Sequence, residues 1–224
     1  MFKIAYAAGH ALSTAGKRLP KALDPGQTRE WTLNDRVARH FAEAAKQYEG
    51  VELLRLDDPA GKAGNPVAKR AKKANDWGAD VLFEFHHNAG IKLGKGGGIV
   101  AFCHKEKTEG AKLRDAVYEA CIAAGGLKGN RASPRQAKAY TILKKFEGAG
   151  VLLECGFMDS RTDAPVILTE SYSKLIGYAV MEAVAKYAGL KKKGEEDDLE
   201  EETVKEVSCQ VDARVLENGA SGDD

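Results

Sequence analysis

The sequence predicts an α/β domain: a three-layer αβα sandwich with a mixed, mainly parallel sheet, followed by a short acidic C-terminal tail. Short apolar segments alternate along the chain with segments of helical periodicity, and this order favours parallel strands joined by helices. The composition, 43% hydrophobic and 30% charged, is typical of a globular protein with a buried core. The 224 residues suffice for one domain of ordinary size plus a tail.

In the first half of the chain, predicted strands are separated by two predicted helices. These strands are expected at residues 2–8, 51–56 and 79–85. A first helix is expected from Thr28, which would be its N-cap because apolar residues follow at helical intervals. A basic helix is expected over 65–77, with Gly78 at its C-cap. The segment 11–27 is rich in Gly, Pro, Lys, Ser and Thr, which indicates a loop.

The second half repeats this alternation. Further strands are expected at residues 96–103, 140–143 and 151–153. A helix is expected over 109–124, a basic loop over 128–138, and a long helix over 163–188. We therefore assign residues 1–190 to a single domain.

The composition changes after Leu190. From Lys191 onward a run of charged residues lacks a hydrophobic face, which is typical of a solvated linker or tail. We assign 191–224 to a charged linker and a short acidic tail of unknown role. Alternation within 204–216 leaves open a small strand or a partner-binding segment.

Charge, cysteine content and hydropathy give no support for several classes of protein. With 34 basic and 33 acidic residues the net charge is +1, which gives no argument for nucleic-acid binding or a membrane-surface patch. The four cysteines are scattered, so we expect buried free thiols. No segment approaches the roughly 20 apolar residues of a membrane span. The N-terminal segment runs directly into Gly9-His10 and does not resemble a signal peptide, so we expect synthesis in the cytoplasm.

Polar side chains follow the carboxyl ends of three predicted strands. They are His10, His86 and Glu154, and Glu30 lies in the first turn of the helix after the first long loop. The carboxyl edge of an open α/β sheet is where ligands gather, so we expect these four residues to converge. Two imidazoles and one carboxylate are a common catalytic zinc set, and a further carboxylate nearby can carry the proton of a water molecule. Spacing alone leaves open a structural histidine or a solvated glutamate at each position.

Five short motifs bear on these alternatives. They are Ala8-Gly9-His10, Glu30-Trp-Thr-Leu-Asn34, His86-His-Asn-Ala89, Gly98-Ile-Val-Ala-Phe102 and Leu152-Leu-Glu-Cys-Gly-Phe-Met-Asp159. Together they resemble the zinc-dependent N-acetylmuramoyl-L-alanine amidases (amidase type 3) of bacterial and phage cell-wall hydrolases. They occur in the order of that family and cover roughly residues 1–188.

The resemblance implies a role for each motif residue. His10, Glu30 and His86 would be the zinc ligands, and Glu154 the catalytic glutamate. The family pattern His-x-Asn-Ala puts His87 at the variable position, and strand alternation agrees that only one of the two histidines faces a given point. This chain departs from the family at Ala11-Leu12, where many members carry Gly-Gly. That departure bears on the shape of the loop and on substrate fit.

Other polar residues have weaker functional interpretations. Asn88 is a candidate for binding substrate, although a role in forming a turn explains it nearly as well. Lys144, with Lys145, precedes the catalytic strand and is a candidate contact for muramyl peptide carboxylates, with a solvated basic loop as the alternative. Cys155 is expected to face the core, opposite to Glu154.

The resemblance implies hydrolysis of the amide bond between N-acetylmuramic acid and L-alanine of the peptidoglycan stem peptide. A chain made in the cytoplasm suits a phage or prophage endolysin that acts on the wall after release, with a host autolysin as the alternative. Two other classes are a zinc peptidase acting on stem peptides and a non-catalytic cell-wall-binding domain of the same fold. A nucleotide-binding domain is disfavoured, because the glycines at 94–98 precede a strand and do not join a strand to a helix.

Overall fold

The computed structural model describes residues 1–64 and 66–194. Contacts group Met1–Leu190 into one unit. Most of the predicted tail, 195–224, lies outside the described residues, so the assignment of 191–224 stays a prediction. Among the residues that are described, no helix is both long and apolar enough to cross a membrane.

Six strands form one sheet in the order β2-β1-β3-β6-β4-β5. All neighbouring strands run parallel except β4 and β6, which are antiparallel, so the predicted mixed, mainly parallel sheet is confirmed. The strands are β1 (Phe2–Ala8), β2 (Val51–Arg55), β3 (Val81–Asn88), β4 (Val100–Cys103), β5 (Arg135–Ala137) and β6 (Ala149–Phe157).

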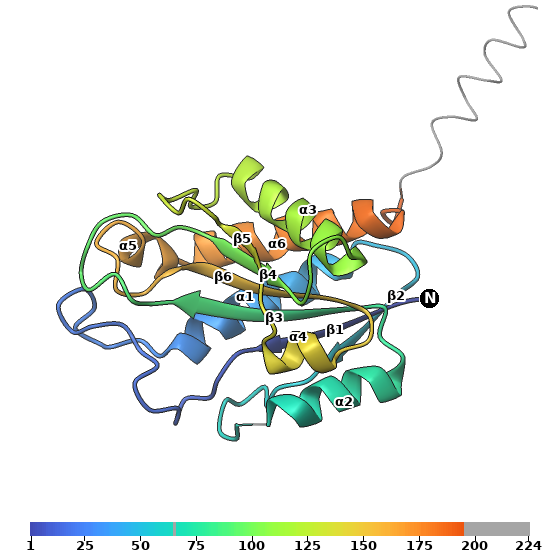
Figure 1. The fold of residues 1–224 in the computed structure, drawn as a ribbon, viewed down its shortest axis with the longest axis horizontal. Helices are drawn as coiled ribbons and strands as arrows, with labels where there is room; N and C mark the ends of the chain where they lie inside the picture. Colours follow the sequence, from blue (N-terminus) through green and yellow to red (C-terminus); the bar gives the residue numbers. More distant parts are fainter. Residues whose placement is uncertain (65, 195–224) are drawn as a thin grey trace, which may run out of the picture. The chain divides into compact units, whose positions relative to one another are not determined.

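Helices cover both faces of this sheet, as Figure 1 shows. One layer holds α1 (Glu30–Ala45), α3 (Glu109–Ala123) and α6 (Glu170–Ala188), with the short α5 (Ala164–Ile167) beside α6. The other layer holds α2 (Val67–Trp77) and α4 (Thr141–Lys145). The predicted three-layer arrangement is therefore confirmed.

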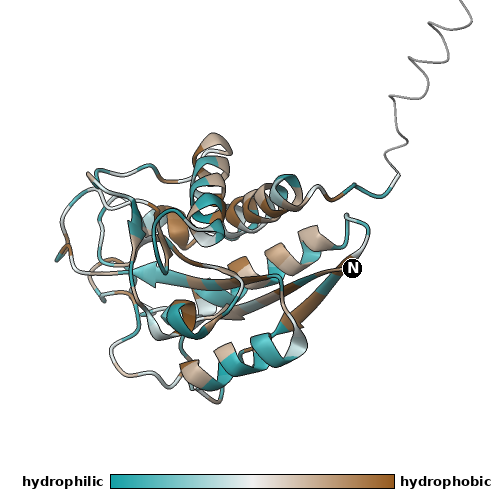
Figure 2. Ribbon diagram, turned by 45° about the vertical axis from the view of Figure 1, so that its right-hand side comes forward, coloured by the Kyte–Doolittle hydropathy of each residue, from teal (hydrophilic) through white to brown (hydrophobic). Residues whose placement is uncertain are grey.

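Alternation along the strands divides the core into two clusters. On β1, Ile4 and Tyr6 pack with the α1, α3 and α6 layer, whereas Ala5 and Ala7 pack with the α2 and α4 layer. Successive side chains of a strand point to opposite faces, so every second residue belongs to the same cluster. Figure 2 shows brown colour along much of the strands and hydrophilic colour along much of α2. The same alternation determines which polar side chains at the end of the sheet face one another.

Two predicted elements at the carboxyl half differ from the structure. Residues 140–143 are predicted as a strand, but α4 is a helix. Its adjacent residues Ile142 and Leu143 are both buried in the core cluster that also includes α2. Backbone hydrogen bonds from Lys144 to Tyr140 and from Phe146 to Ile142 follow the helical spacing. The expectation of a strand was wrong because local apolar content cannot separate a short buried helix from a strand.

The predicted long helix over 163–188 is two helices. It breaks before α6, where the side chain of Thr169 accepts a hydrogen bond from the backbone nitrogen of Tyr172 and caps the new helix. The basic loop predicted over 128–138 also contains an element that the sequence did not reveal, because β5 pairs there with Ala101–Cys103 of β4.

Smaller corrections concern where elements begin. The N-cap position of the first helix is Arg29, which makes no capping hydrogen bond with its side chain, and the carbonyl of Thr28 accepts a hydrogen bond from the nitrogen of Leu19. Gly78 does end α2, in the left-handed conformation that favours glycine there. Both His86 and Glu154 lie inside their strands, not after them as predicted. Cys103, Cys121 and Cys155 are buried and free, and Cys209 lies outside the described residues.

Candidate metal centre

Three side chains from three separate segments meet at one end of the sheet. His10 follows β1, Glu30 is the first residue of α1, and His86 lies near the end of β3. Glu30 Oε1 lies 3.3 Å from His10 Nε2 and 3.2 Å from His86 Nδ1. One ligand atom from each of the three residues lies within 4.8 Å of the others. Among the described residues, this is the one group of three His, Cys, Asp or Glu side chains close enough to share an ion.

The backbone at Gly9 and His10 allows this approach. A Cβ atom at Gly9 would lie 2.1 Å from His86 Cε1, so any larger residue would displace the imidazole. His10 has φ 67°, in the left-handed region that residues other than glycine seldom adopt. The turn is tied down by Asn34 of α1, whose Nδ2 donates to the carbonyl oxygen of Gly9 at 3.0 Å. The loop geometry therefore directs the imidazole of His10 toward Glu30.

Strand alternation sends the two adjacent histidines to opposite sides of the sheet. His86 faces Glu30, whereas the Nδ1 atom of the buried His87 lies 2.7 Å from Asn34 Oδ1. Burial lowers the pKa of His87 to about 4, so its imidazole is neutral near pH 7. His87 thus helps to hold Asn34, and through it Gly9, and it does not join the three-residue group.

Glu30 is 1% exposed, and its ionisation depends on its neighbours. Burial alone would raise the pKa of Glu30, but hydrogen bonds with His10 and His86, together with their charges, hold that pKa well below its usual value. The other oxygen, Oε2, is buried without a hydrogen-bond partner, and Lys17 Nζ lies 3.5 Å from it. An ionised, incompletely satisfied carboxylate between two imidazoles is a set of donors that suits a divalent cation such as zinc.

Glu154 lies beside this group on the neighbouring strand. It is paired in register with His86 across β3 and β6 and faces the same side of the sheet. Its Oε2 atom is buried without a hydrogen-bond partner. Burial raises the pKa of Glu154 to about 7, while the charge of His86 opposes this shift and that of Glu30 adds to it. A carboxyl group with a pKa near neutrality can both accept and donate a proton.

A cavity of about 570 Å³ opens onto these side chains. His10, His86 and Glu154 form polar parts of its lining. Apolar lining comes from the other layer of helices, including Val67 of α2 and Ile142 of α4. Concave sites with mostly apolar walls and a few convergent polar groups are typical of ligand sites.

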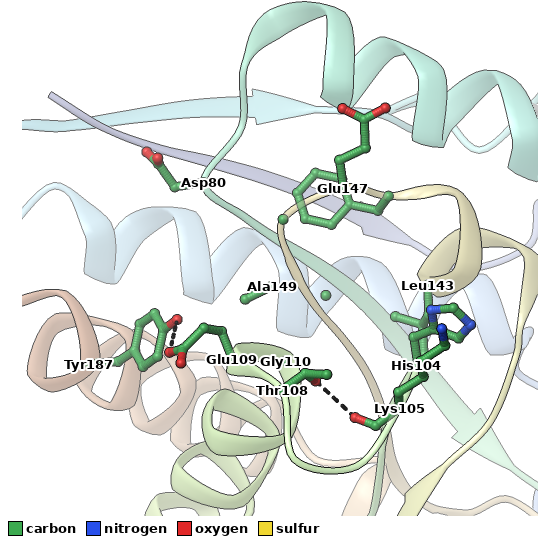
Figure 3. A pocket seen from close by; sticks show the side chains of 13 residues that line it. Asp80, His104, Lys105, Thr108, Glu109, Gly110, Leu143, Glu147, Ala149 and Tyr187 are labelled. Atoms are coloured by element: carbon green, nitrogen blue, oxygen red, sulfur yellow. Dashed lines mark hydrogen bonds between the residues drawn. The ribbon is translucent and has the colours of Figure 1, made fainter.

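A second hollow, of about 440 Å³, is drawn in Figure 3. It lies where α3 begins, near the start of β6 and the end of α6. The hydroxyl of Tyr187 donates to Glu109 Oε2 at 3.2 Å, and that of Thr108 donates to the carbonyl oxygen of Lys105 at 2.8 Å. Tyr187, Glu109 and Thr108 are therefore paired within the hollow. His104 lines this hollow without joining a ligand group, in keeping with the single group described above.

The two candidate substrate contacts lie outside the cavity that holds Glu154. Asn88 ends β3, and its Oδ1 accepts a hydrogen bond from the nitrogen of Ala89, as expected of a turn residue. It lines a smaller neighbouring cavity of about 230 Å³. Lys144 is exposed on α4, whereas the residues of that segment that line the larger cavity are Tyr140, Thr141 and Ile142.

The sequence interpretation missed two charged residues beside the site. Glu84 and Arg70 both line the cavity, and Arg70 Nη2 lies 3.1 Å from Glu84 Oε2. The sequence contains a signal for Glu84. This residue lies two positions before His86 on the same strand, so both side chains must face the same side of the sheet. No local pattern marks Arg70, since its partner comes from another element.

Comparison with known proteins points to one family. A family model described as N-acetylmuramoyl-L-alanine amidase matches residues 4–186. No curated protein matches the chain. Among solved structures, the catalytic domain of CwlV, an N-acetylmuramoyl-L-alanine amidase from Bacillus (Paenibacillus) polymyxa var. colistinus, is similar with a TM-score of 0.73 and 15% identity, covering 85% of this chain and 100% of that one.

Two further solved structures share the fold. An N-acetylmuramoyl-L-alanine amidase from Clostridium difficile 630 has a TM-score of 0.73 and 20% identity, and the match covers 84% of this chain and 97% of that one. The catalytic domain of an endolysin targeting Clostridia difficile has a TM-score of 0.63 and 19% identity, covering 83% of this chain and 98% of that one.

Proposed function

The chain belongs to the N-acetylmuramoyl-L-alanine amidase family, and we propose that it is a zinc-dependent member that cleaves the amide between N-acetylmuramic acid and L-alanine in peptidoglycan. The family supports a hydrolase acting on the cell wall. The observation that carries the zinc-dependent mechanism is the convergence of His10, Glu30 and His86 within 4.8 Å, beside a cavity that Glu154 lines together with the two histidines.

Each of the four residues has a defined task in this proposal. His10 Nε2, His86 Nδ1 and Glu30 Oε1 would hold the metal, since these atoms already face one another. A zinc ion bound there would polarise the scissile carbonyl and lower the pKa of a water molecule to about 7. Glu154 accepts the proton of the attacking water and delivers it to the departing amine of L-alanine. Its raised pKa suits both steps.

Digestion of purified peptidoglycan tests the reaction and the metal together. We expect the protein to release intact stem peptides with a new L-alanine amino terminus, and a chelator to abolish this release because the water loses its activating cation. Adding back Zn²⁺ should restore release. Mass spectrometry of the soluble fragments is the measurement, with Mg²⁺ added back in a parallel sample as the control.

Each alternative function predicts a different set of fragments. Fragments cut within the stem peptide, with L-alanine still attached to muramic acid, would indicate a peptidase and contradict the amidase. Binding to the wall without release of any fragment would indicate a non-catalytic domain. Retention of all four candidate residues, with His10, Glu30 and His86 grouped beside the cavity that Glu154 lines, favours the enzyme. Release that is unaffected by the chelator would contradict the role of a metal.

We further propose that the enzyme acts as a phage or prophage endolysin, in agreement with its similarity to an endolysin catalytic domain. Chain produced in the cytoplasm of susceptible bacteria is then expected to leave the cells intact until the membrane is permeabilised, because the substrate lies beyond it. Culture turbidity before and after permeabilisation is the measurement, with the Glu154→Gln variant as an inactive control. Lysis before permeabilisation would instead favour an exported host autolysin.

A further inference from the structure

A buried carboxylate that the proposed mechanism does not use lies beside the metal centre. Glu84 is 1% exposed and is located on β3, two residues before His86 and on the same face of the sheet. Its Oε2 atom lies 3.5 Å from His86 Nε2 and 3.1 Å from Arg70 Nη2. One oxygen atom therefore faces both an imidazole of the metal group and a guanidinium of α2.

Fold stability does not account for this arrangement. Burying a carboxylate costs several kcal/mol unless it is paired, and Arg70, itself only 5% exposed, provides the pairing. A buried ion pair is nevertheless often no more stabilising than two apolar residues of similar volume. The pair is also incompletely satisfied, since Arg70 Nε and both carboxylate oxygens of Glu84 make no hydrogen bond, and the contact of Oε2 with Arg70 is an ion pair only. An incompletely satisfied ion pair that lines the cavity beside the metal group points to a role at that site.

The two nitrogens of His86 have different surroundings. Nδ1 faces Glu30 Oε1 at 3.2 Å, on the side where the ligand atoms converge, and Nε2 faces Glu84. A neutral imidazole carries its proton on only one nitrogen, and the other nitrogen has the lone pair that binds a metal. A cation bound where the ligand atoms converge would take the lone pair of Nδ1, which faces Glu30. The proton of the neutral ring would then be on Nε2, where the Glu84 carboxylate can accept it.

We propose that Glu84, held in place by Arg70, is a positioning residue that orients His86 for metal binding by accepting the proton of Nε2. Histidines that bind metals commonly donate their second nitrogen to such a carboxylate, which fixes the ring and strengthens the ligand. The inference rests on the proposed metal-dependent function. It adds two residues that no motif of the resemblance includes, one of them from a different layer of the fold.

Zinc affinity of the full chain tests the inference without any measurement of activity. The dissociation constant for Zn²⁺ is measured by competition with a chromophoric chelator for the wild type, Glu84→Gln and Glu84→Met. Loss of the carboxylate is expected to weaken binding about 10–100-fold, as for other residues that support a metal ligand. Glu84→Met should show the larger loss, because glutamine can still accept the proton of Nε2. Glu52→Gln, which removes a carboxylate from β2, is the control and should bind as the wild type does.

The double variant Arg70→Met/Glu84→Met separates positioning from stability. It removes both charges together, so no unpaired charge stays buried, and its metal-free thermal midpoint should lie above that of Glu84→Met alone. Zinc affinity should nevertheless stay at least about 10-fold below that of the wild type. Wild-type affinity in both Glu84→Met and the double variant would overturn the inference while leaving the proposed function intact. A wild-type chain that binds no Zn²⁺ would overturn both.

Discussion

Replacing Glu154 with glutamine is expected to lower kcat for peptidoglycan hydrolysis by about 10²–10⁴-fold, the usual contribution of a general acid–base residue. Glutamine has nearly the same shape but cannot take the proton of the attacking water. The carboxyl group of Glu154 is the one suited to this task, because its pKa is raised to about 7 by burial and its Oε2 atom lacks a hydrogen-bond partner.

Zinc content distinguishes this loss from damage to the metal centre. Glu154 is not one of the three residues whose ligand atoms converge, so Glu154→Gln should bind one equivalent of zinc, measured by elemental analysis of the purified protein. Glu147→Gln, at an exposed position shortly before β6, is the matched control and should have wild-type kcat. A Glu154→Gln protein with full activity would exclude the proposed proton transfer.

Removing a metal ligand is expected to have the second large effect. His86→Ala or Glu30→Ala leaves two ligands in place of three, and both zinc content and hydrolysis should fall together. The metal contributes several kcal/mol to the transition state, so a loss of about 3 kcal/mol would lower kcat/KM by roughly 10²-fold. Elemental analysis and fragment release are measured on the same preparations.

Comparison with a histidine outside the cavity makes this test specific. His104→Ala removes an imidazole that lines the second hollow, and it should keep both zinc and activity. In contrast to Glu154→Gln, the ligand variants should lose metal and hydrolysis in proportion. A His86→Ala protein that retains a full equivalent of zinc would show that the ion binds elsewhere, and the proposed centre would then be wrong.

Much of the candidate site could be predicted because its residues have local signatures. His10 and Glu30 lie in short motifs next to a strand and a helix, and alternation on a single strand separates His86 from His87. Both kinds of evidence depend on residues close together in the sequence. The position of His86 and Glu154 inside their strands was missed, because the end of a strand depends on which neighbour it pairs with.

The remaining differences arise from contacts between distant segments. The composition of α4 is typical of a strand. Its helical conformation becomes evident only from its packing with α2, which buries two adjacent residues of α4. Lys144 of this helix is exposed and is not among the residues that line the cavity, and its role in substrate binding stays a prediction. Arg70 lies in the helix that was predicted only as basic, and the fold brings it opposite Glu84.

By itself, the sequence determined the α/β class, the order of most strands and helices, the family and the residue types of the candidate metal group. These follow from periodicity and from short motifs, which are properties of neighbouring residues. Only the tertiary structure decided how the sheet is ordered, that α4 is helical, and that Glu84 and Arg70 lie behind His86. The physical reason is that burial and charge pairing depend on segments that become neighbours only when the chain folds.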